Sequence, residues 1–126
     1  MTEEKKRILL VEDDIFVKDI YNTKFKLEGY EVILAENGVE ALKKLEESTP
    51  DIILMDIMMP YMDGLEALAK IRENETWKKI PVIMLSNLSD KEHIDFAMDK
   101  GASECLIKAH FTPAEVAKKV HDLIGS

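Results

Sequence analysis

Short runs of apolar residues recur along the chain, separated by longer and more polar stretches. Each run is nearly continuous, which is typical of strands covered on both faces of a parallel sheet. The five runs span residues 8–11, 32–35, 52–55, 82–85 and 105–107. Because a short buried helix segment can show the same pattern, the stretches between the runs must decide between the two interpretations.

Those intervening stretches carry apolar residues at helical spacing, as Val116, Val120 and Leu123 do in the last of them. Four begin with a small polar residue and a glutamate three positions later, as in a capping box. These pairs are Asn37 with Glu40, Asp63 with Glu66, Ser89 with Glu92, and Thr112 with Glu115. Gly29 and Gly101 stand where left-handed residues would end two helices. The alternation of strand and helix predicts one doubly wound α/β domain.

Length and charge narrow the range of functions. A chain of 126 residues suits one compact domain, which we expect at residues 5–125 after a short tail at residues 1–4. The net charge of -8 disfavours nucleic-acid binding by this segment, because phosphate backbones attract basic surfaces. With a single cysteine and no long apolar run, we expect a cytoplasmic protein without a membrane span.

Chemically active side chains follow four of the five apolar runs. Ligands of open α/β sheets bind beyond the carboxyl ends of the strands, so these side chains would converge at one edge. They are Glu12, Asp13 and Asp14 after the first run, Asp56 after the third, Ser86 after the fourth and Lys108 after the fifth. Asp14 has two interpretations, as a member of the acidic cluster or as the cap of the following helix.

An acidic cluster of this kind calls for a cation. Neighbouring carboxylates repel each other unless they are protonated or neutralised. Mg²⁺ suits such a site best, because it prefers oxygen ligands and is often completed by a phosphate oxygen, and Mn²⁺ is a possible substitute. Lys108 would then act as a point charge on the phosphate, and the Ser86 hydroxyl could donate a hydrogen bond to it.

The same segments resemble the receiver domain of bacterial two-component response regulators, the CheY-like family. The resemblance rests on LVEDD at 10–14, MDIMMP at 55–60 with MDG at 62–64, MLSN at 84–87, and GA at 101–102 with IK at 107–108. It covers essentially the whole chain. It implies a flavodoxin-like α/β domain with five helices and a five-stranded parallel sheet of order 2-1-3-4-5.

The resemblance also implies a role for each site residue. Asp56 would accept the phosphoryl group, and Glu12 and Asp13 would form the acid pair that holds Mg²⁺ together with Asp56. The backbone carbonyl of Met58 would complete the metal site. Ser86 matches the switch hydroxyl of the family, and Lys108 matches its lysine.

A receiver domain is a signalling phosphoacceptor, and it catalyses only its own phosphorylation and dephosphorylation. The implied phosphodonor is a sensor histidine kinase or a histidine phosphotransfer protein. The implied output is a downstream protein that binds the face formed by the fourth helix, the fifth strand and the fifth helix. The resemblance allows a monomer or a phosphorylation-dependent dimer.

Two residues depart from the family pattern. Ala109 follows Lys108 where the family usually has a proline that permits a cis peptide, and a cis bond without proline costs about 2.5–4 kcal/mol. A cis and a trans Lys108–Ala109 peptide therefore both remain open. Cys105 replaces an aromatic residue that turns inward on activation in many relatives. We therefore expect signalling to depend on Ser86 and on the loop after the fourth strand.

Two other functions are compatible with the fold class. An aspartyl-phosphate phosphohydrolase generally needs a second aspartate two residues after the nucleophile, where this chain has Met58. A flavin-binding module needs a loop that holds phosphate after the first strand, where this chain has three acids that would repel the ligand. The signalling domain is the leading hypothesis.

Overall fold

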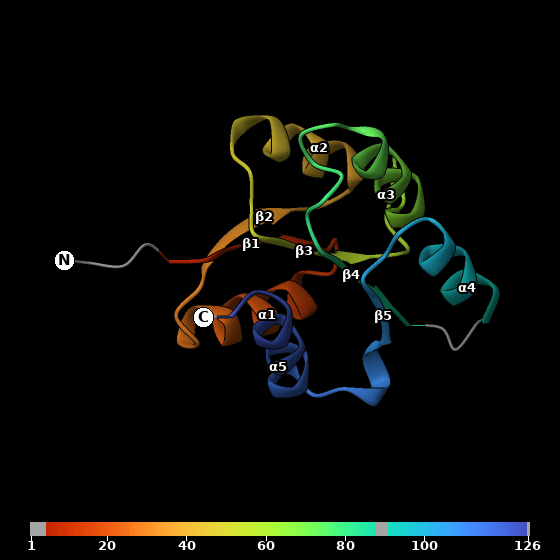
Figure 1. Cartoon of the computed structure of the whole chain (residues 1–126). Coiled ribbons are helices and arrows are strands. Elements are labelled where there is room, and N and C mark those ends of the chain that lie inside the picture. Colours follow the sequence, from red (N-terminus) through yellow and green to blue (C-terminus); the bar gives the residue numbers. More distant parts are fainter. Residues whose placement is uncertain (1–4, 88–90, 126) are drawn as a thin grey trace.

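A five-stranded parallel sheet forms the centre of the computed structural model, which describes residues 5–87 and 91–125 (Figure 1). The strands are β1 (Arg7–Val11), β2 (Glu31–Ala35), β3 (Ile52–Asp56), β4 (Val82–Ser86) and β5 (Glu104–Ile107). They lie in the order β2-β1-β3-β4-β5, and every neighbouring pair is parallel. The predicted fold class and strand order are confirmed.

Helices cover both faces of the sheet. They are α1 (Ile15–Leu27), α2 (Gly38–Glu47), α3 (Gly64–Glu73), α4 (Lys91–Asp99) and α5 (Pro113–Ile124), with a short 3-10 turn at Lys108–His110. Helices α1 and α5 lie on one face, and α2, α3 and α4 lie on the other (Figure 1). Each face encloses its own apolar core: Phe25 and Val120 pack in one, and Leu45, Leu68 and Ala97 pack in the other.

The strands extend beyond the predicted apolar runs at several ends. β3 and β4 each include one further residue, Asp56 and Ser86, and these polar residues are buried with their strands. β5 starts one residue earlier than predicted, at Glu104. A polar residue is tolerated there because β5 is an edge strand and Glu104 is only half-buried. Two of the predicted site residues are therefore the last residues of buried strands.

Polar caps fix where the helices begin. The Thr112 side chain accepts a hydrogen bond from the Glu115 N–H, and the Glu115 carboxylate accepts one from the Thr112 N–H, which completes the predicted capping box. The Asn37 and Asp63 side chains cap α2 and α3 by accepting hydrogen bonds from the Glu40 and Glu66 N–H groups. The predicted cap at Ser89 lies outside the described residues.

Two glycines end helical segments in the left-handed region, as predicted. Gly29 has φ 94° after α1, and Gly101 has φ 102° after α4. A residue with a β-carbon rarely adopts these values, so both turns depend on glycine. None of the helices in the described part of the chain combines the length and the apolar character needed to cross a membrane.

Candidate functional site

The strand register brings the predicted site residues to one edge of the sheet. Val11 pairs with Met55, Asp56 pairs with Leu85, and Ser86 pairs with Ile107, so four strands end at nearly the same level. The residues at these ends are Glu12 after β1, Asp56 on β3, Ser86 on β4 and Lys108 after β5. Segments that are far apart in sequence thus share one site, as the parallel topology predicts.

Three carboxylates form the centre of this site. Oxygen atoms of Glu12, Asp13 and Asp56 all lie within 4.8 Å of one another. Glu12 and Asp56 are only 1% and 3% exposed, whereas Asp13 faces solvent. Burial of two like charges this close is unfavourable without a compensating positive charge.

Lys108 supplies part of that positive charge. Its Nζ donates a hydrogen bond to Glu12 Oε1 and another to Asp56 Oδ2, the latter at 3.0 Å. Burial alone would lower the pKa of Lys108, but the hydrogen bonds and charges of Glu12 and Asp56 outweigh it and raise this pKa. Lys108 therefore stays protonated and holds the two buried carboxylates together.

The two buried carboxylates also have backbone partners. Glu12 Oε2 accepts a hydrogen bond from the Asp14 N–H at 3.1 Å, and Asp56 Oδ1 accepts one from the Met58 N–H at 3.3 Å. Burial nevertheless raises the pKa of Glu12, and the hydrogen bond from Lys108 only partly opposes this effect. Three carboxylates lie around a single lysine ammonium, so the cluster is short of positive charge even with Lys108 in place.

The donor set fits Mg²⁺. Three carboxylate oxygens are close enough together to be shared by one small ion, and Asp13 leaves the cluster open to solvent on one side. Mg²⁺ is commonly held by a few carboxylates and completes its shell with water or phosphate. Glu12, Asp13 and Asp56 are the residues that would hold it, and participation of the Met58 carbonyl stays a prediction.

Asp14 belongs to helix α1 rather than to the acidic cluster. Its Oδ1 accepts hydrogen bonds from the N–H groups of Phe16 and Val17, at 2.9 and 3.1 Å. It therefore acts as the N-cap of α1. Of the two interpretations of Asp14, the structure supports the cap.

The two residues that depart from the receiver-domain pattern, Cys105 and Ala109, lie on β5 and directly after Lys108. No peptide bond in the described segments is cis, so the Lys108–Ala109 peptide is trans, and Lys108 still reaches Asp56. Cys105 is half-buried on β5 and packs against the core that includes Ala97 of α4. Burial raises the pKa of the Cys105 thiol.

The loop after β3 is held tightly by its glycine. The Gly64 N–H donates to the Ile57 carbonyl at 2.8 Å, so α3 begins directly against the end of β3. A β-carbon at Gly64 would lie 2.2 Å from the backbone carbonyl oxygen of Asp56. The sequence motif at 62–64 pointed to this loop, but the reason for its glycine emerges only from the packing.

A strained turn in the same loop was not predicted. Tyr61 has φ 67°, which is uncommon for a bulky residue, and the Met62 N–H donates to the Pro60 carbonyl at 2.8 Å across it. The Met62 carbonyl in turn accepts from the Gly38 N–H at 3.0 Å. These bonds fix the loop between β3 and α3, which contains Met58.

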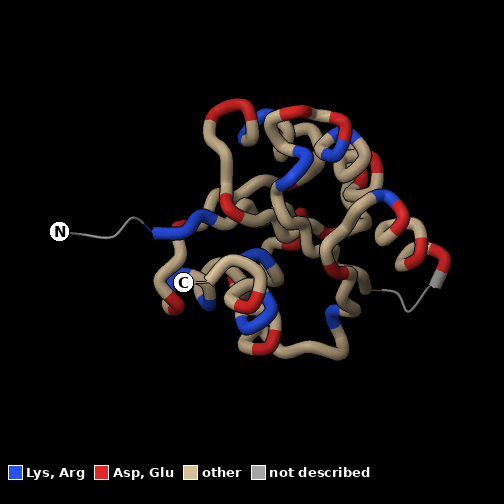
Figure 2. The backbone as a smooth tube through the Cα atoms, viewed as in Figure 1, with Lys and Arg blue, Asp and Glu red and all other residues tan. Residues whose placement is uncertain are grey.

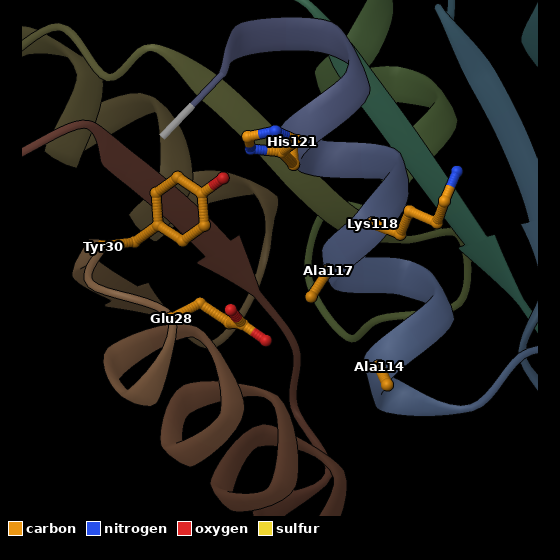
Figure 3. A pocket seen from close by; sticks show the side chains of 6 residues that line it. All are labelled: Glu28, Tyr30, Ala114, Ala117, Lys118 and His121. Carbon is orange, nitrogen blue, oxygen red and sulfur yellow. The ribbon is translucent and has the colours of Figure 1, made fainter.

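A separate hollow lies between α1 and α5, away from the acidic cluster (Figure 3). It has a volume of about 410 Å³ and is lined by Glu28, Tyr30, Ala114, Ala117, Lys118 and His121. The Tyr30 hydroxyl already donates to the Gly125 carbonyl at 2.8 Å. The charged groups around this hollow have both signs, and they indicate no particular ligand.

Clustered carboxylates and a lysine at the carboxyl edge of a parallel sheet suit a domain that binds Mg²⁺ and phosphate. The model of the response regulator receiver domain family matches residues 8–121. The chain therefore belongs to the response regulator receiver domains of two-component systems. Phosphorylation on aspartate and a requirement for Mg²⁺ are standard for this family.

Relatives with curated descriptions include longer transcriptional regulators and a chemotaxis protein of similar length. The chain is 33% identical over 124 residues to a probable transcriptional regulator ycf27 from Cyanophora paradoxa, covering 98% of this chain and 50% of that protein. It is 41% identical over 103 residues to the chemotaxis protein CheY from Listeria monocytogenes, covering 81% of this chain and 85% of CheY. The chain spans about half the length of the transcriptional regulators that it matches.

Solved structures show the same fold. A putative response regulator from Chloroflexus aurantiacus has a TM-score of 0.91 at 28% identity, covering 98% of this chain and all of that chain. The receiver domain of the sensor histidine kinase PA1611 from Pseudomonas aeruginosa has a TM-score of 0.88 at 30% identity, covering 98% of this chain and 100% of its own. That structure has a magnesium ion coordinated in its active-site cleft. Family membership favours the signalling hypothesis over the hydrolase and flavin-binding alternatives.

Replacing Asp13 by asparagine is expected to make the stability of the protein largely independent of Mg²⁺. The variant removes one charge from the cluster, so the metal-free protein should unfold at a higher urea concentration than the wild type. At tenfold its dissociation constant, a ligand stabilises the native state by about 1.4 kcal/mol, and this gain should be largely lost in the variant. Urea unfolding with and without MgCl₂ measures both effects.

Asp14→Asn is the matched control, because asparagine caps a helix about as well as aspartate does. It should retain the stabilisation by Mg²⁺. We assign Asp13 to the metal site and place Asp14 outside it. If both variants lost this stabilisation equally, that assignment would be wrong.

Proposed function

We propose that Asp56 is the phosphoacceptor of this receiver domain, in a reaction that depends on Mg²⁺ at Glu12, Asp13 and Asp56. The observation that carries the proposal is the position of the Asp56 carboxylate. It is buried at the end of β3, it accepts a hydrogen bond from Lys108, and it lies within 4.8 Å of two further carboxylates. We take residues 5–125 as the receiver domain and residues 1–4 as a tail.

The chemistry is a phosphoryl transfer to a carboxylate. A carboxylate oxygen of Asp56 attacks phosphorus, and the bond from phosphorus to the donor group breaks in line as its electron pair leaves with that group. Lys108 balances negative charge on the phosphoryl oxygens, and the Ser86 hydroxyl donates a hydrogen bond to one of them. Bound Mg²⁺ supplies further charge neutralisation. Catalysis by this domain consists of positioning and electrostatics, for its own phosphorylation and for its own dephosphorylation.

A protein phosphodonor is supported by the surface beside the site. The first turns of α1 expose three large apolar side chains, and Phe16 is 78% exposed. The other two are Ile15 and Ile20. Exposed apolar groups grouped next to a reactive site are typical of a docking surface. A sensor histidine kinase or a histidine phosphotransfer protein is the proposed partner at this surface.

The proposed output surface comprises α4, β5 and α5. α4 is the first helix after Ser86 in the sequence, and β5 is followed directly by Lys108, so both elements neighbour the phosphorylation site along the chain. A shift at either residue would move this surface. A downstream protein is the proposed partner there.

Incubation with a small acyl phosphate and MgCl₂ tests the proposal. We expect intact-mass analysis to show one added phosphoryl group. Borohydride reduction of the acyl phosphate, followed by peptide mapping, should place it at Asp56. MnCl₂ should replace MgCl₂, and a chelator should prevent the reaction. A phosphoryl group mapped to another residue, or uptake that persists in the chelator, would disprove this proposal.

A further inference from the structure

A groove between α3 and α4 has no role in the proposed phosphorylation reaction. Its volume is about 380 Å³. Leu65, Ala69 and Phe96 give it apolar walls, and Asp63, Glu66 and Lys100 carry the charges that border it. The groove is thus apolar inside and charged along its rim, as binding sites for amphipathic segments are.

Phe96 is a surface side chain rather than a core residue. It is 46% exposed, whereas Ala97 next to it is fully buried. The Lys100 ammonium lies 5.2 Å from the centre of the Phe96 ring, so its flexible side chain partly covers the ring. An aromatic ring in this position can serve as an anchor for a partner at little cost, because only a mobile lysine has to move.

Both walls of the groove are connected to the phosphorylation site. α3 begins at Gly64, which packs against the backbone carbonyl of Asp56. α4 is the first helix after Ser86, the last residue of β4. A change at Asp56 or Ser86 therefore reaches the two helices at their ends nearest the site.

The charges around the groove favour a basic occupant. Asp63 and Glu66 stand on the α3 side, and α4 carries Glu92, Asp95 and Asp99 along its length. Figure 2 shows acidic residues on both helices, and the basic residues of α3, Lys70 and Arg72, lie in its last turn. Among the residues that line the groove, Lys100 is the sole cation, and it lies over the Phe96 ring. The chain as a whole has a net charge of -8, which strengthens the attraction for a basic segment.

We propose that the groove between α3 and α4 binds an amphipathic helix of a partner protein, with an apolar side chain against Phe96 and basic side chains beside Asp63 and Glu66. This surface adjoins the proposed output face but lies on the opposite flank of α4. The docking does not depend on phosphorylation. Phosphorylation of Asp56 changes the affinity of the groove for the helix, and that part rests on the proposed function.

Selection from a random-peptide display library on the wild-type protein provides the probe. The selected peptides are synthesised, labelled, and titrated by fluorescence anisotropy. We expect basic peptides with apolar residues at helical spacing. Phe96→Ala and Glu66→Lys should each weaken their binding about tenfold or more, as expected for central contacts of an interface.

Two variants on other surfaces serve as controls. Leu123→Ala removes an exposed apolar side chain from α5, and Glu46→Lys makes the same charge change on α2. Both should bind the peptides as the wild type does. Phosphorylation by acyl phosphate and the urea midpoint show that each variant is folded.

Selected peptides that bind Phe96→Ala as tightly as the wild type would overturn the proposal. A second outcome would also overturn the proposal: the chain self-associates, Phe96→Ala abolishes this self-association, and no peptide binds at the groove. The groove would then bind a second copy of the chain. The titrations are repeated with acyl phosphate and MgCl₂, with intact mass measured on the same samples. Phosphorylated protein of unchanged affinity would overturn the regulation. Absence of added mass would instead count against the proposed function, while the titration of unmodified protein still decides the docking.

Discussion

The Asp56→Asn variant is expected to take up no phosphoryl group from a small acyl phosphate under conditions that phosphorylate the wild type fully. Asparagine has nearly the shape of aspartate, and the site should remain folded around it. Its amide, however, lacks the charged oxygen that attacks phosphorus. Intact-mass analysis over a time course measures the difference.

Asp14→Asn is again the informative control, because Asp14 lies beside the cluster but caps α1. This variant should be phosphorylated at close to the wild-type rate. The assignment of Asp56 would be wrong if Asp56→Asn still acquired the full added mass, and the placement of Asp14 outside the site would be wrong if Asp14→Asn acquired none.

Gly64→Ala is expected to lower the free energy of unfolding by about 3 kcal/mol, at the upper end of typical overpacking costs. The new β-carbon would lie 2.2 Å from the Asp56 carbonyl oxygen and 2.8 Å from the Met84 side chain. The methionine can move, but the carbonyl belongs to a buried strand. The start of α3 would therefore have to shift, and Asp56 with it. Urea unfolding measures the stability, and the rate of phosphorylation by acyl phosphate should fall as well.

Gly29→Ala separates the clash from the general effect of losing a glycine. Gly29 has φ 94°, but no atom lies within 4 Å of the position that a β-carbon would take there, so this substitution costs backbone strain only, about 1 kcal/mol. If Gly64→Ala were no more destabilising than Gly29→Ala, the close approach to Asp56 would not be what requires glycine at position 64.

The fold could be predicted from the sequence because the apolar runs and the helix caps indicate the same order of strands and helices. Continuous apolar runs such as 52–55 indicate strands buried on both faces, and the caps at Asn37, Asp63 and Thr112 mark helix starts. The prediction missed the first residue of three strands, which are Arg7 of β1, Glu31 of β2 and Glu104 of β5. Glu104 is polar, and its place in the strand follows from pairing with Ile83 rather than from its own character.

The residues of the candidate site could be predicted from the sequence, but the contacts between them could not. Parallel topology places residues after the strand ends together, and this placed Glu12, Asp56 and Lys108 in one site. Side-chain directions are set by packing, so the sequence left Asp14 open between cap and ligand. The hydrogen bonds from Lys108 to both buried carboxylates depend equally on three-dimensional placement.

The sole thiol of the chain is that of Cys105, half-buried on β5 against the core beneath α4. Its raised pKa keeps it protonated at neutral pH, and protonated thiols react slowly with alkylating agents. Partial burial and the raised pKa therefore both slow such labelling in the native domain. An increase in the alkylation rate of Cys105 above that of the native domain reports loosening of the packing between α4 and β5, without any engineered probe.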